Sequence, residues 1–97
     1  MPVRLEATVR GVVQGVGFRY FVIGLVRGTS VTGWVANGGA GEVRCVMEGE
    51  RADLERFLLE LERGPAGALV DHVRAVWMPV TGSFRDFSIR SGGHSGD

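Results

Sequence analysis

The fold is decided by residues 3–26, which read VRLEATVRGVVQGVGFRYFVIGLV. Apolar and polar side chains alternate from Val3 to Val9, which is the period of a strand with one buried face. Three glycines follow within residues 11–17, and apolar residues then recur at helical spacing from Phe18 to Val26. The stretch therefore predicts a strand, a glycine-rich loop and a helix, in that order.

A hairpin and a second helix come next along the chain. Residues 32–36 and 42–48 have the composition of two antiparallel strands around the turn-rich residues 37–41. An apolar stripe at helical spacing predicts a helix over residues 51–63, which ends where Gly64 is followed by a proline.

The last part of the chain predicts strands around residues 72–79 and 84–90. The first six of these seven elements have the order β-α-β-β-α-β, which indicates an α+β fold, a ferredoxin-like sandwich whose mainly antiparallel sheet carries both helices on one face. We expect residues 1–90 to form this one domain. Residues 91–97 are rich in serine and glycine, so we expect a disordered tail.

Composition excludes several classes of protein. The chain has 97 residues, enough for one domain, and its eleven basic residues, all arginine, balance eleven acidic ones. A net charge of zero argues against nucleic acid or an anionic membrane as a partner. Cys45 is the one cysteine, so no disulfide forms within the chain, and we expect Cys45 to be a small core residue. We also expect the protein to be cytoplasmic and monomeric. No apolar run reaches the length of a membrane span.

The glycine loop is the candidate functional element. A glycine-rich backbone that turns from a strand into a helix presents several amide N–H groups, and the helix N-terminus adds partial positive charge. We therefore expect the loop to bind an oxyanion. Arg19 adds a planar, always ionised fork at the start of the helix. The chain has no lysine for a Walker motif, and Tyr20 stands where the dinucleotide motif needs glycine. Spacing alone leaves open that the glycines only shape a tight turn.

The full strings are more specific. Residues 11–21, GVVQGVGFRYF, closely resemble the first signature of the acylphosphatase family, and residues 32–37, TGWVAN, resemble its second. The likeness extends over roughly residues 3–90 and includes the segments 61–65 and 84–89. The chain thus resembles small acylphosphatases that stand alone.

The resemblance implies a hydrolase that cleaves the carboxyl-phosphate anhydride of small acyl phosphates, without metal or cofactor. Arg19 would bind the phosphoryl oxygens, and the Asn37 side chain would orient the attacking water. Inorganic phosphate would be product and inhibitor. The family site also implies a ring of backbone amides around the phosphate, from Gln14, Gly15, Val16, Gly17, Phe18 and Arg19.

Elementary chemistry agrees with this assignment. A carboxylate leaves without protonation, so the reaction needs no general acid, and the loose phosphoryl transition state is accelerated by charge stabilisation and by placing water in line. A guanidinium, amides and one carboxamide suffice for a direct displacement with no covalent intermediate. The chain has neither the Ser-His-Asp order of a serine hydrolase nor the His-Glu-x-x-His motif of a zinc protease.

Several features leave other interpretations open. Asn37 and Gly38 form the commonest dipeptide of a type I′ turn, so Asn37 could serve the turn alone. Ala40 stands where the family commonly has aspartate, and Gly38 and Gly39 replace bulkier residues, which puts the rigidity of the hairpin tip in question. Gly24 and Gly28 weaken the first helix.

The sequence leaves three alternatives to a small acylphosphatase that stands alone. The front module of large hydrogenase-maturation proteins resembles the glycine loop, but Tyr20 stands where those modules tend to have proline. An RNA-binding domain of the same topology would need stacking aromatics on its central strands, and residues 42–48 have none. A family member that binds phosphate without turnover is the third alternative.

Overall fold

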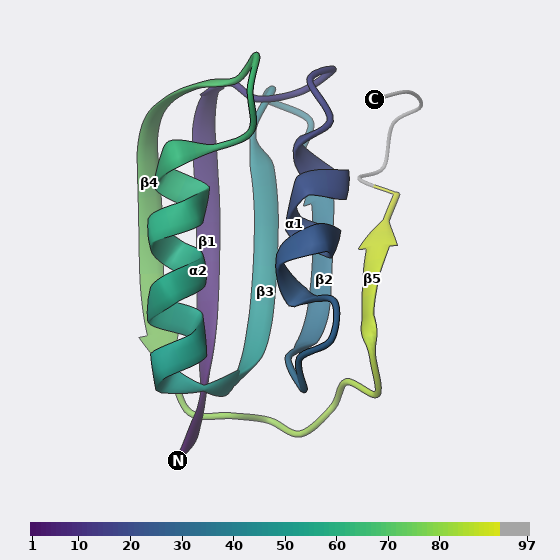
Figure 1. Cartoon of the computed structure of the whole chain (residues 1–97), viewed down its shortest axis with the longest axis vertical. Coiled ribbons are helices and arrows are strands. Elements are labelled where there is room, and N and C mark those ends of the chain that lie inside the picture. The colour runs from purple at the N-terminus through teal and green to yellow at the C-terminus, as the bar shows by residue number, and fades with distance from the viewer. Residues whose placement is uncertain (92–97) are drawn as a thin grey trace.

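The computed structural model describes residues 1–91 and contains two helices and five strands (Figure 1). Along the chain they are β1 (Pro2–Val12), α1 (Phe18–Val26), β2 (Thr32–Asn37), β3 (Val43–Glu50), α2 (Arg51–Arg63), β4 (Leu69–Met78) and β5 (Phe87–Arg90). The expected tail lies outside the described residues, apart from Ser91.

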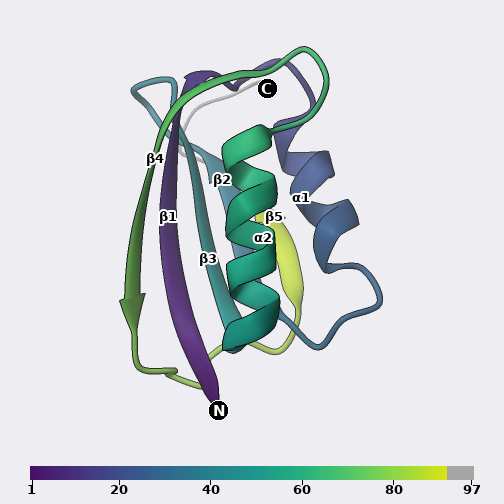
Figure 2. The ribbon, with the colours of Figure 1, turned by 60° about the vertical axis from the view of Figure 1, so that its left-hand side comes forward.

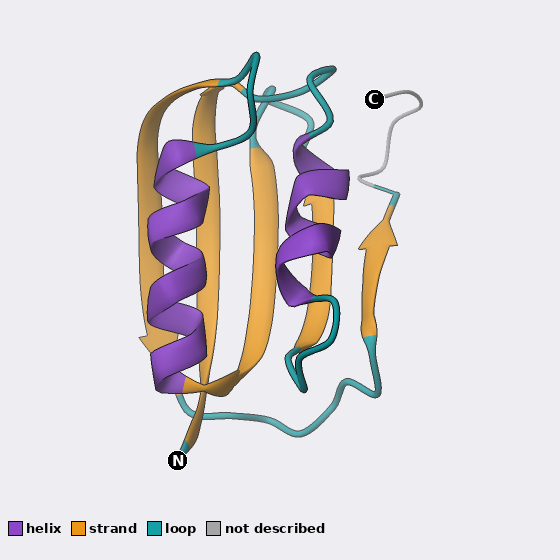
Figure 3. Cartoon of the chain, in the orientation of Figure 1, coloured by secondary structure: helices purple, strands orange, loops and turns teal. Residues whose placement is uncertain are grey.

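The strands form one sheet in the order β4-β1-β3-β2-β5, and both helices cover the same face of it (Figures 2 and 3). β1 pairs antiparallel with β3 and β4, β2 pairs antiparallel with β3, and only β5 is parallel to its neighbour, β2. The predicted α+β, ferredoxin-like sandwich with a mainly antiparallel sheet is confirmed. The connection from β4 to β5 crosses below the sheet and adds the fifth strand at the edge (Figure 1).

The last two strands, β4 and β5, begin at other residues than predicted. β4 begins at Leu69 because β1 continues beyond a register shift at Arg10/Gly11, and the two strands pair up to Val12 and Leu69. β5 begins only at Phe87, so the expected strand from residue 84 was too long. Phe84 belongs to the crossing connection instead, where its ring lies 5.3 Å from the Arg4 guanidinium carbon.

The core lies between the sheet and the helices. It is formed by inward-facing strand residues and by one stripe of each helix, and its fully buried members include Leu5, Val9, Phe18, Val22, Val35, Met47, Leu54 and Leu61. Cys45 is 1% exposed, and burial raises the pKa of its thiol, which confirms a core role rather than a reactive one. At Gly33 the φ of 137° and the carbonyl oxygen of Val46 leave no room for a Cβ, so two strands approach closely there.

Glu48 is a buried carboxylate at the end of the sheet crossed by the β4–β5 connection. Its side chain is 3% exposed and accepts hydrogen bonds from the Thr81 amide and hydroxyl, the Gly82 amide and Arg4 Nη1, at 2.7–3.0 Å. Burial alone would raise the pKa of Glu48, but these four bonds outweigh burial and lower it to about 2. The carboxylate therefore ties the crossing connection to β3.

We expect Glu48→Gln to lower the free energy of unfolding by about 3 kcal/mol at pH 7, because a neutral amide cannot accept four donors and leaves Arg4 without its buried partner. The native pKa is depressed, so the ionised form stabilises the native state above the unfolded pKa of about 4.3, and this contribution is lost as the pH falls towards 2.

Urea denaturation between pH 7 and pH 2 measures both effects. Wild type should lose stability across the lower part of this range, and the variant should lose less of it. Glu55→Gln is the matched control, since Glu55 forms an exposed pair with Arg51 on α2 and should change stability by only a few tenths of a kcal/mol. Equal stability of Glu48→Gln and wild type at pH 7 would contradict the proposed anchor.

Candidate active site

The loop between β1 and α1 is shaped by two glycines in the left-handed region. Gly15 has φ 74° and Gly17 has φ 78°, and Gly17 is the N-cap of α1. No side chain caps this helix end, and its first turn holds no acidic residue. With no side-chain cap and no negative charge there, the positive end of the helix dipole favours an anion.

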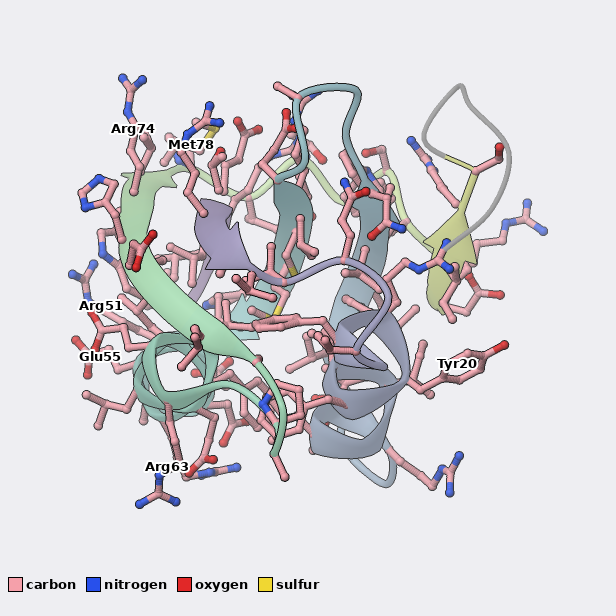
Figure 4. All side chains as sticks on the ribbon, turned by 90° about the horizontal axis from the view of Figure 1, so that it is seen from above. Tyr20, Arg51, Glu55, Arg63, Arg74 and Met78 are labelled. Atoms are coloured by element: carbon pink, nitrogen blue, oxygen red, sulfur yellow. The ribbon has the colours of Figure 1, made fainter. Side chains whose placement is uncertain are left out.

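The loop opens onto a cavity of about 210 Å³. Its lining combines the loop, the first turn of α1 and the end of β2: Gly15, Gly17, Phe18, Arg19, Tyr20 and Asn37. The structure thus brings Arg19 and Asn37, predicted from two separate signatures, to one cavity. Viewed from this end of the molecule, Tyr20 points away from α1 towards the outside, and its residue is 69% exposed (Figure 4).

Two of the six residues predicted to donate amides do not line this cavity. Val16 is half-buried and packs against the hydrophobic core, and the Gln14 side chain bonds to the β2–β3 hairpin. The part that their backbone amides take in anion binding stays a prediction. Gly15, Gly17, Phe18 and Arg19 are in place at the lining.

Asn37 is the last residue of β2, paired with Val43, and the turn begins only after it, where the Gly38 amide donates to the Glu42 carbonyl oxygen at 2.8 Å. Asn37 is 4% exposed, yet its Nδ2 has no hydrogen-bond partner among the described residues. An unpaired buried donor costs about 1–3 kcal/mol, and such groups are retained where they serve a ligand. The buried Asn37 amide is therefore a second feature that indicates a binding site, besides the helix N-terminus that no side chain caps.

Sequence reasoning missed the role of the Gln14 side chain. Its Nε2 donates to the carbonyl oxygens of Gly38 and Glu42, each at 2.9 Å, so it joins the glycine loop to the hairpin. The loop and the hairpin turn lie at the same end of the sheet (Figure 1). A long amide side chain in a glycine loop was the one available signal, but its partners are 24 and 28 residues away.

A larger groove, of about 370 Å³, lies at the other end of α1 and is lined in part by Ile23, Arg27 and Phe87. It contains no buried side chain without a hydrogen-bond partner, whereas the smaller cavity has Asn37. Unsatisfied polar chemistry, rather than volume, marks the smaller cavity as the candidate site.

Within residues 1–91, no three histidine, cysteine or acidic side chains gather to hold a metal ion. None of the helices in the same range is long and apolar enough to cross a membrane. His72 is exposed on β4, and His94 lies outside the described residues.

Comparison with known proteins gives consistent matches. The sequence model of the acylphosphatase family matches residues 5–89. The acylphosphatase of Moorella thermoacetica is 43% identical over 89 residues, which cover 92% of this chain and 95% of that protein. The crystal structure of acylphosphatase from Bacillus subtilis superposes with a TM-score of 0.86 at 31% identity, over 91% of this chain and 98% of that chain.

A larger protein also contains this fold. The crystal structure of full-length HypF matches with a TM-score of 0.84 at 29% identity, but the matched region is 96% of this chain and only 13% of that one. By contrast, the matched segment makes up nearly the whole of the Moorella and Bacillus proteins. On the family model and on relatives of this identity and coverage, the chain belongs to the acylphosphatase family.

Proposed function

We propose that the chain hydrolyses the carboxyl-phosphate anhydride of small acyl phosphates, giving a carboxylate and inorganic phosphate. The observation that carries the proposal is one cavity shared by three groups: a helix N-terminus without a side-chain cap, the residue Arg19, and Asn37 with its buried amide that lacks a partner among the described residues. Each suits a different part of the reaction, and membership of the acylphosphatase family supports the assignment.

The phosphoryl group binds at the glycine loop. The amides at the start of α1 and the Arg19 guanidinium hold its oxygens, which carry the charge of the loose transition state. The amides belong to the backbone that turns at Gly15 and Gly17, so they need little reorganisation when the reaction occurs.

Asn37 orients the attacking water on one side of phosphorus. Its Nδ2 is a donor with no other partner among the described residues, so a water at the cavity satisfies it and is directed in line with the scissile bond. The water oxygen forms the new bond to phosphorus as the bond to the carboxylate oxygen breaks. The water protons pass to solvent or to phosphate, and no enzyme-bound covalent intermediate forms.

The leaving carboxylate needs no proton, so the site requires no general acid and no metal in this scheme. Cys45 is buried in the core away from the cavity and takes no part. The protein would act as a monomer, which analytical ultracentrifugation can check.

Hydrolysis of benzoyl phosphate and acetyl phosphate by the purified chain tests this function. We expect turnover that is unchanged, within about twofold, after EDTA treatment, because the proposed donors are an arginine, amides and a carboxamide. Inorganic phosphate and sulfate should inhibit competitively with the acyl phosphate, since both fit the same cradle.

Metal dependence or non-competitive inhibition by phosphate would contradict the mechanism. Phosphate binding with no turnover of any acyl phosphate would favour the alternative of a protein that only binds the anion. Isothermal titration with phosphate separates these results from simple misfolding.

A further inference from the structure

The Gln14 side chain holds the hairpin that carries Asn37. Its two donated bonds, to the carbonyl oxygens of Gly38 and Glu42, use both N–H groups of the carboxamide. Gly38 directly follows Asn37, and Glu42 closes the turn. Gln14, in the glycine loop, is therefore hydrogen-bonded to both ends of the turn beside Asn37.

Glu42 holds the same turn from within. Its carbonyl oxygen accepts the Gly38 amide, and its carboxylate accepts the Ala40 amide at 2.9 Å. The carboxylate occupies the position that a Cβ on Gly38 would take. Hydrogen bonds from the Glu42 and Ala40 amides lower the pKa of Glu42 despite its partial burial, so the carboxylate remains ionised near neutral pH.

The turn itself has little side-chain packing, because residues 38–41 are three glycines and one alanine. Turns of this composition are conformationally free unless other groups fix them. Gln14 and Glu42 are two such groups here, and Gln14 belongs to the glycine loop. The contact therefore links the two halves of the site.

We propose that Gln14 is a positioning residue, whose side chain sets the place of Asn37 relative to the bound phosphoryl group. This inference rests on the proposed function, because Asn37 acts on the water only if the chain is a hydrolase. In-line attack is sensitive to small displacements, and a misplacement of about 1 Å costs up to about 10²-fold in rate. Gln14 would thus affect the rate of the reaction without contacting the reacting atoms.

The test compares wild type with Gln14→Met, which keeps the length of the side chain and removes both donors. We expect kcat for acetyl phosphate to fall roughly ten- to hundredfold, while the inhibition constant of inorganic phosphate stays within about twofold. Hydrogen exchange of the Gly38 amide, measured by NMR, should become faster as the turn loosens. Val12→Thr is the matched control, at an exposed position two residues earlier, and it should keep all three values.

Two results for Gln14→Met would overturn the proposal. An unchanged kcat for Gln14→Met overturns the proposal, and so does a loss of phosphate affinity that matches the loss of rate, because the cradle itself would then have been disturbed. If wild type hydrolyses no acyl phosphate, the proposed function fails. The exchange rate at Gly38 still decides in that case whether Gln14 holds the hairpin, and unchanged exchange would overturn that as well.

Discussion

Asn37→Ala is expected to abolish measurable hydrolysis of acyl phosphates while leaving phosphate binding intact. The variant removes the group that we assign to the water and leaves the glycine loop, the helix N-terminus and Arg19 in place. Loss of water orientation should cost at least about 10²-fold in kcat, comparable to the loss of one preorganised donor at a charged transition state. Phosphate affinity, measured by calorimetry, should change by less than about threefold.

The matched control for Asn37→Ala is Thr32→Ala, at the opposite end of the same strand and outside the candidate cavity. It should retain wild-type kcat. A clear loss of phosphate affinity in Asn37→Ala would assign Asn37 to anion binding instead of to the water. Wild-type turnover in Asn37→Ala would contradict the catalytic role of Asn37 and assign its side chain a structural role only.

Arg19→Ala is expected to lower kcat/KM by roughly 10²- to 10³-fold and to weaken inhibition by phosphate in parallel, because the guanidinium holds the phosphoryl oxygens in both the ground state and the transition state. Arg19→Lys should recover only part of this loss, since an ammonium lacks the planar fork that matches two oxygens. Steady-state kinetics with acetyl phosphate, with phosphate as inhibitor, measures both values.

Arg27→Ala is the control for Arg19→Ala, because Arg27 is exposed just beyond the opposite end of α1 and lines the larger groove there. It should leave kcat/KM within about twofold of wild type. Near-normal activity of Arg19→Ala would contradict the proposal that the Arg19 guanidinium holds the phosphoryl oxygens. The two arginine variants and the Asn37 variant together separate anion binding from water placement.

The elements of this fold were predictable where a local pattern decided them. Alternation predicted residues 3–9 of β1, which extends from Pro2 to Val12, and an apolar stripe with a glycine and proline after it predicted α2. The boundaries of β4 and β5 depended on partners instead. β4 starts early because β1 continues past its register shift, and β5 starts late because Phe84 lies by Arg4 and Arg90 in the crossing connection.

The candidate site was predictable as a set of residues but not as an arrangement. Family signatures indicated Arg19 and Asn37, and the structure places both at one cavity. The sequence left the position of Asn37 in strand or turn open, because the dipeptide that it forms with Gly38 is equally typical of a turn. The Gln14 contact was not predictable, because it joins segments that become neighbours only when β1 and β3 pair.

The place of β1 in the sheet has a consequence for how the site comes into being. β1 precedes the other four strands along the chain, yet its two neighbours in the sheet are β3 and β4, and β4 ends at Met78. Strand pairings over such long sequence separations form slowly, because the entropy of a long chain segment is lost before the pairing contributes favourable contacts. The glycine loop directly follows β1, so we expect the anion site to reach its final geometry only after the chain has been synthesised as far as Met78, the end of β4.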